Sequence, residues 1–232
     1  MIKVKVVKFV LDMPLKRLIE KVSSLSGYGS QDNSCTLTEF SDNSLSAVYV
    51  EKVVTRETII DLQGKENVID VVRYPRYEFQ IQRFVKENEF LLLVFNPPRS
   101  LRGLVEFLVS VLDKNIYFRE SKLSVDKFIE LAKFSKDIES VTVDKIKVKG
   151  VEVSRTSYAD ITISSSVNAY HDLESFLDDK SYKISNARTR VKTKFGSGKV
   201  EASSTGLLGI DEAVFDEILF FFLKSASDIV VN

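Results

Sequence analysis

The chain has 232 residues, 44% of them hydrophobic, which is enough to bury the core of one large domain or of two small ones. Its 33 basic and 33 acidic residues cancel, so attraction to a polyanion requires local segregation of charge. One cysteine, Cys35, and one histidine, His171, exclude an internal disulfide and a zinc site built from these residue types.

The first 25 residues predict a strand followed by a helix. Lysine and valine alternate over residues 3–6, and apolar residues then recur at helical spacing from Leu15 to Leu25. This start lacks the continuous apolar segment of a signal peptide, and the most apolar segment, Ile218 to Leu223, is far below the roughly 20 residues of a membrane span. With Cys35 in a polar Ser-Cys-Thr setting, we expect a cytoplasmic protein without membrane association.

The rest of the chain alternates predicted strands and helices. Further predicted strands cover 34–62, as a hairpin broken at 41–44, and then 77–83, 90–95, 141–153, 158–164, 188–195 and 199–205. Further predicted helices begin after Ser100 and from Ser124, and cover 167–177 and about 210–224. Residues 27–33 predict a loop, and a turn is expected at 87–88.

This order predicts an α+β fold, with a largely antiparallel twisted sheet and helices mainly on one face. Residues 77–112 and 189–223 share the order strand, turn, strand, connector, apolar helix. We therefore expect a single α+β domain over 1–232 that a duplication could divide into halves 1–115 and 123–232. Two unrelated hairpin-helix units would show the same pattern, so the duplication stays open.

Residues 188–195 form the most informative segment. Arg188, Arg190, Lys192 and Lys194 occur at two-residue spacing, which places them roughly 6.6 Å apart on one face of a strand. Such a row of like charges repels itself unless something anionic lies along it.

A hairpin loop at Ser197 and Gly198 sets the expected register of this strand. It would turn Phe195 inward opposite Val200 and place Lys194 opposite Glu201 on the outer face. We therefore expect the other three cations of the row to lack an acidic partner within the hairpin.

Two further cationic rows could lie on the same sheet face. They are formed by Lys145, Lys147 and Lys149, and by Lys3 and Lys5. The alternative interpretation is a solvated outer face, on which lysines discourage edge-to-edge aggregation and nearby acids such as Asp144, Glu152 and Asp160 balance the charge.

The candidates for catalysis favour ordinary structural roles. His171 is expected to be exposed and Cys35 to lie in a polar loop, and no nucleophile elbow occurs. Residues 196–199, Gly-Ser-Gly-Lys, lack the spacing of a phosphate loop. The acidic pairs at 211–217 suit the first turns of a helix better than magnesium. We therefore expect no catalytic residue, cofactor or metal.

The last predicted helix is apolar nearly all round, which is typical of a helix buried on more than one side. It is either a central core helix or half core and half partner interface, and Phe220, Phe221 and Phe222 are the candidate interface residues.

Together these features favour a non-enzymatic module that docks on the backbone of DNA or RNA through a basic sheet face. The expected phosphate contacts are Arg188, Arg190, Lys192 and Lys194, supported by Lys145, Lys147, Lys149 and Lys199. The alternative is a subunit of a protein assembly whose basic face meets an acidic partner and whose terminal helix aids oligomerisation. A hydrolase or nuclease with a dispersed site is a third interpretation.

Overall fold

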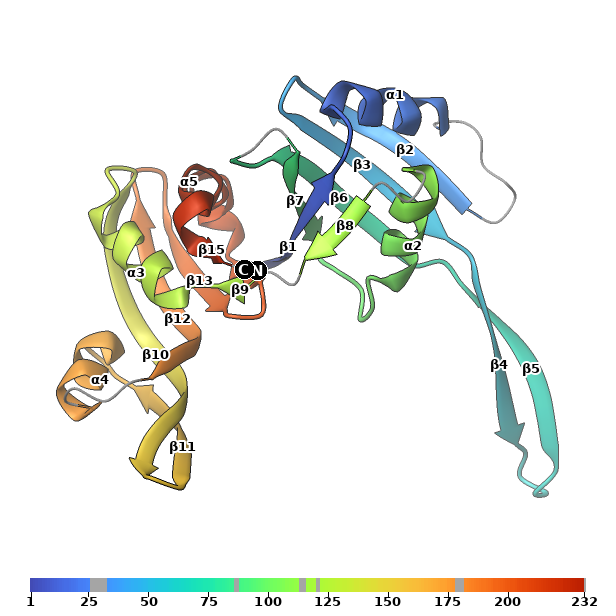
Figure 1. Ribbon diagram of the computed structural model, residues 1–232. Coiled ribbons are helices and arrows are strands. Elements are labelled where there is room, and N and C mark those ends of the chain that lie inside the picture. Colours follow the sequence, from blue (N-terminus) through green and yellow to red (C-terminus); the bar gives the residue numbers. More distant parts are fainter. Residues whose placement is uncertain (26–32, 86–87, 113–115, 120–121, 178–181, 232) are drawn as a thin grey trace. The chain divides into compact units, whose positions relative to one another are not determined.

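The computed structural model describes residues 1–25, 33–85, 88–112, 116–119, 122–177 and 182–231 (Figure 1). The fold is α+β and its sheets are antiparallel, as the sequence predicted. The chain forms two compact units, which we call the middle unit, residues 10–117, and the terminal unit, residues 1–9 with 118–232. Duplication of one half from the other stays a prediction. The loop expected at 27–33 and the turn expected at 87–88 lie largely outside the described residues.

The middle unit is a sheet with two helices. Its elements are α1 (Leu15–Leu25), β2 (Asn33–Phe40), β3 (Ser44–Glu51), β4 (Val53–Ile60), β5 (Glu66–Arg73), β6 (Arg76–Arg83), β7 (Glu89–Phe95) and α2 (Arg102–Val111). Strands β2, β3, β6 and β7 lie side by side in that order, each antiparallel to the next. Strand β7 is buried almost throughout, which confirms the prediction from its continuous apolar run.

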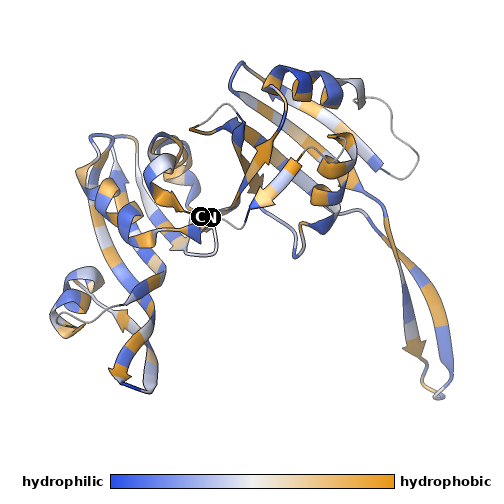
Figure 2. Ribbon diagram, viewed as in Figure 1, coloured by the Kyte–Doolittle hydropathy of each residue, from blue (hydrophilic) through white to orange (hydrophobic). Residues whose placement is uncertain are grey.

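Strands β4 and β5 form a separate two-stranded sheet that the sequence did not predict, and we call it the β4–β5 arm. Nearly all of its residues are exposed, and hydrophobic and hydrophilic segments follow each other along both strands (Figure 2). Two cross-strand ion pairs, Arg56–Asp70 at 3.3 Å and Arg73–Glu57 at 2.7 Å, add to the backbone ladder. The arm therefore holds its shape mainly by hydrogen bonds rather than by a core of its own.

Strand β1 (Ile2–Leu11) begins in the terminal unit and ends in the middle unit, and β8 (Ile116–Arg119) carries the chain back. The remaining elements all belong to the terminal unit. They are β9 (Lys122–Leu123), α3 (Val125–Phe134), β10 (Ile138–Ser154), β11 (Ser157–Ser164), α4 (Ala169–Leu177), β12 (Lys183–Thr193), β13 (Ser197–Ser203), β14 (Leu207–Ile210), a 3₁₀ turn η1 (Glu212–Val214), α5 (Phe215–Ile229) and β15 (Val230–Val231).

The sheet of the terminal unit has the strand order β11-β10-β12-β13-β14-β1, and helices pack on the face that carries its apolar side chains. Helices α3 and α4 contact β10, and Phe128 of α3 meets Phe221 of α5 edge-to-face at 5.8 Å between ring centroids. Helix α5 begins at Phe215, five residues later than predicted, because Leu207–Ile210 forms a strand that the sequence did not predict.

The turn between β12 and β13 lies three residues earlier than predicted. The chain turns at Lys194 and Phe195, where the backbone N–H of Thr193 donates to the carbonyl of Gly196 at 2.8 Å. The hydroxyl oxygen of Thr193 also accepts hydrogen bonds from the backbone N–H groups of Phe195 and Gly196, both at 3.2 Å. The predicted loop at Ser197 and Gly198 is therefore wrong, and Phe195 is 81% exposed rather than turned inward.

The two glycines that suggested a loop at 197–198 serve a different purpose. A Cβ on Gly196 would lie 2.7 Å from the carbonyl oxygen of Ala213, and one on Gly198 would lie 2.8 Å from a methyl of Val214. Their missing side chains therefore let the 3₁₀ turn η1 pack directly against the start of β13.

Candidate nucleic-acid interface

Strand β12 has one exposed and one buried face. Arg188, Arg190 and Lys192 are exposed and alternate with Thr189 and Val191, which are buried against the helices. The predicted cationic row is thus present over these three residues. Lys194 is not part of it, because it lies in the turn beyond the end of the strand at Thr193.

Strand pairing brings the three predicted rows onto one face of the sheet. Lys145 of β10 lies opposite Arg188, which lies opposite Glu201 of β13, and the same row continues through Gly209 of β14 to Lys3 of β1. Because directly opposite residues point to the same side of an antiparallel sheet, these side chains share the outer face.

A second row of opposed residues runs parallel to the first. It joins Lys147, Asn186, Ser203, Leu207 and Lys5. We call the resulting surface the basic face. It consists of Lys3, Lys5, Lys145, Lys147, Arg188, Arg190, Lys192 and Lys199.

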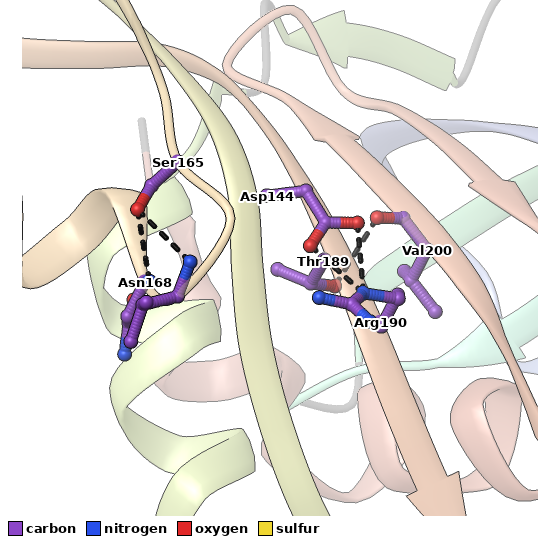
Figure 3. Close-up of polar contacts among 7 residues, drawn as sticks. Asp144, Ser165, Asn168, Thr189, Arg190 and Val200 are labelled. Carbon is purple, nitrogen blue, oxygen red and sulfur yellow. Dashed lines mark hydrogen bonds and ion pairs between the residues drawn. The ribbon is translucent and has the colours of Figure 1, made fainter.

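Arg188, Arg190 and Lys192 form ion pairs. The expectation that they lack an acidic partner within the hairpin is wrong for Arg188, whose partner lies on β13, whereas the partners of Arg190 and Lys192 lie outside the hairpin, on β10. Arg188 Nε lies 2.6 Å from Glu201 Oε1, and Lys192 Nζ lies 2.9 Å from Glu139 Oε2. Arg190 Nε lies 2.8 Å from one carboxylate oxygen of Asp144 and 3.1 Å from the other (Figure 3). Because the turn is shifted, Glu201 lies opposite Arg188, whereas the predicted register placed it opposite Lys194.

The other two carboxylates come from irregular positions of β10. Asp144 falls between the pairs Val143–Thr189 and Lys145–Arg188, and Glu139 falls where the register shifts between Ile138 and Ser140. An extra residue at a β-bulge is left out of the ladder and re-aims the side chains around it. The bulge at Asp144 also restores Lys145 and Lys147 to the outer face, because strict alternation from Val143 would have turned them inward.

Three lysines of the basic face have no acidic partner among the described residues. Within the described part of the chain, the side chains of Lys145, Lys147 and Lys199 form no ion pair. Glu152 and Asp160, which would balance the lysines under the alternative interpretation of a solvated face, make no ion pair with any described residue. The ion pairs that do form are between side chains at least partly exposed, so each contributes little to stability.

Lys149 of β10 forms the last pair of the β10–β12 ladder, in which it lies opposite Lys183. The backbone N–H of Lys199 donates a hydrogen bond to the carboxylate of Asp211 at 2.8 Å. This bond gives a structural role to one of the acidic residues that precede the last helix. Asp211 therefore anchors β13 to η1.

Of the residues considered for catalysis, His171 is exposed on α4, as expected. Cys35 is not in a loop: it lies on β2, is 4% exposed and faces Tyr49 of β3. Burial raises the pKa of its thiol from 9.0 to about 11, so the thiol stays protonated and unreactive near neutral pH.

The candidate interface on α5 is largely part of the core. Phe221 and Phe222 are 3% and 0% exposed, because they lie on the side of the helix that packs on the sheet and on α3. For these two residues the core alternative is therefore confirmed, and they are not available as interface residues. Phe220 is 61% exposed.

Comparisons with models of protein families and with curated proteins find no match for this sequence. The helices of the described residues include none that combines the length and apolar character needed to cross a membrane. In the same part of the chain, no three acidic, histidine or cysteine residues are grouped so that they could hold a metal ion.

Proposed function

We propose that the protein is a non-enzymatic cytoplasmic module whose terminal unit docks on the backbone of DNA or RNA through the basic face. The observation that carries the proposal is the strand register, which collects cations from β1, β10, β12 and β13 on one side of the sheet. The helices occupy the other side, so they do not compete for this surface.

The spacing of the basic face suits a polyanion better than a single small anion. Cations recur roughly 6.6 Å apart along a strand, and neighbouring strands are about 4.8 Å apart. A chain of phosphates can meet several of these cations at once and release the counterions that surround the nucleic acid. Such contacts fix position and affinity without reading sequence, so little base preference is expected.

The ion pairs on the basic face are compatible with this role. Arg188 and Arg190 use Nε for their carboxylates, and their terminal nitrogens form no hydrogen bond with the described residues. A guanidinium carries five N–H donors, so each arginine can hold its carboxylate and donate to a phosphate at the same time.

The test uses Lys145, Lys147 and Lys199, which form no ion pair with any described residue. The triple variant Lys145→Gln, Lys147→Gln, Lys199→Gln removes three positive charges from the basic face without breaking a salt bridge. The control variant Lys16→Gln, Lys65→Gln, Lys127→Gln makes the same change in net charge at exposed lysines elsewhere. Affinity for single- and double-stranded oligonucleotides is measured in about 50 mM salt, where electrostatic binding is strong.

We expect the triple variant to bind all sequences more weakly, while the control stays near the parent. The slope of log affinity against log salt should fall by roughly 0.7 to 0.9 for each phosphate that the variant no longer neutralises. If the parent protein binds neither DNA nor RNA at this ionic strength, the proposal is wrong. The alternative, an acidic protein partner, then predicts that the triple variant loses a protein that co-purifies with the parent.

A further inference from the structure

The terminal unit contains a cleft of about 750 Å³ beside the end of the basic face, which is within the size range of small-ligand sites. Side chains from several strands and helices and from the segments that connect them line it. Those that matter chemically are Lys122, Asp126, Lys149, Tyr170, Tyr182 and Lys183.

Three lysines converge on this cleft, and none of them forms an ion pair with a described residue. Lys149 and Lys183 lie directly opposite each other on β10 and β12, an arrangement in which like charges destabilise a sheet. Lys122 of β9 lines the same cleft. A bound anion would relieve this repulsion.

Two half-buried tyrosines give the cleft an aromatic part beside its lysines. Tyr170 of α4 and Tyr182, just before β12, both line the cleft. Lys133 Nζ already lies over the Tyr170 ring, 4.3 Å from its centroid, so Tyr182 is the ring offered for stacking. Burial, followed by the nearby carboxylate of Glu174, raises the pKa of both phenols, so their hydroxyls remain donors. Asp126, at the first turn of α3, is the acidic group in the lining and accepts a hydrogen bond from Ser124 at 2.7 Å.

We infer that this cleft binds a nucleoside phosphate. The lysines would hold the phosphate, a tyrosine ring would stack on the base, and the Asp126 carboxylate would accept a hydrogen bond from a ribose hydroxyl. A simple phosphate or sulfate would leave the tyrosines unused, whereas a purely apolar ligand would leave the lysines unneutralised.

The same chemistry can come from two sources. One is a free mononucleotide, which requires nothing of the basic face. The other is one nucleotide of a strand that already lies on that face, and this version rests on the proposed function. Lys147 of the basic face and Lys149 of the cleft are two residues apart on β10, so a single strand could reach both.

The experiment titrates the folded protein with AMP, with inorganic phosphate and with a short single-stranded oligonucleotide, using calorimetry. The test variant is Lys149→Gln with Lys183→Gln, and a second variant is Tyr182→Leu. Lys127→Gln, an exposed lysine of α3 outside the cleft lining, is the control. Because removing opposed like charges does not threaten the sheet, circular dichroism should show unchanged folding.

If AMP binds, we expect the double lysine variant to weaken it about tenfold or more, and Tyr182→Leu to weaken AMP but not phosphate. If only the oligonucleotide binds, and the lysine variant weakens it, the ligand is a nucleotide within a strand. The inference is overturned if neither AMP nor oligonucleotide affinity responds to the cleft variants. Loss of oligonucleotide binding in the basic-face triple variant would still support the proposed function in that case, and AMP binding alone would support the cleft without it.

Discussion

Arg190 on β12 and Asp144 on β10 form a forked ion pair, in which one Nε–H reaches both carboxylate oxygens, at 2.8 and 3.1 Å. Asp144 can do this because it is the extra residue of a bulge and is not committed to a ladder position. The charge of the basic face is therefore moderated by acids whose placement depends on bulges and on the hairpin register.

Removing these acids tests whether the face acts electrostatically. We predict that Glu139→Gln, Asp144→Asn and Glu201→Gln together raise oligonucleotide affinity and steepen its salt dependence, because three cations lose their internal partners. Exposed ion pairs contribute about 0 to 1 kcal/mol each, so folding should survive. Glu20→Gln, Glu130→Gln and Asp228→Asn provide a control of equal charge at exposed acids elsewhere. A matching gain in the control, or weaker binding in the test variant, would contradict a specific role for the basic face.

Helix α5 should behave as a core element. We predict that Phe222→Ala lowers the free energy of unfolding by about 3 to 5 kcal/mol, because the ring is fully buried. Phe220→Ala should change it by no more than about 0.5 kcal/mol, since this ring is mostly exposed. Urea denaturation of both variants measures the difference. Equal losses for the two would mean that the helix is not oriented as described.

The buried thiol should make the protein less stable at high pH. The pKa of Cys35 is raised to about 11 in the folded state. The contribution of the protonated thiol to the free energy of unfolding is therefore complete below the ordinary pKa of 9.0 and is lost as pH rises through about 11. Burial also raises the pKa of the adjacent Tyr49, to about 12, which acts in the same direction. We predict a shallower decline of unfolding free energy between pH 9 and 11 for Cys35→Ala than for the parent.

The β4–β5 arm should be removable. Val54 and Val72 are opposed in the register, so the residues between them can be replaced by Asn-Gly, which closes a two-residue hairpin. We expect the free energy of unfolding to change by about 1 kcal/mol or less, because the deleted residues bury little apolar surface. Chemical denaturation checks this, and a loss of several kcal/mol would show that the arm supports the core.

Side-chain alternation and helical periodicity predicted most of the strands and helices, because both patterns depend on which residues are apolar. The basic face was predicted for the same reason, since Arg188, Arg190 and Lys192 alternate with buried residues. These signals are local, and each belongs to one element.

The sequence-based predictions were wrong where the local structure depends on residues distant in the sequence. Gly198 resembles a turn residue, and only the packing of Val214 against it shows why a glycine is needed within a strand. The ion pairs of Arg190 and Lys192 depend on bulges, which no alternation pattern reveals. Cys35 looked polar from its neighbours Ser34 and Thr36, yet on a strand those neighbours point to the opposite face.

Strand β1 also affects how the chain folds. Ile2 pairs with Ile210, so the first strand of the terminal unit gains this partner only after about 200 further residues have been made. At roughly 5 to 20 residues per second, that delay is on the order of 10 to 40 s during synthesis. The middle unit is contiguous and need not wait in this way. Val4, fully buried in the finished sheet, remains without β14 throughout this interval, so we expect chaperones to bind the nascent strand β1.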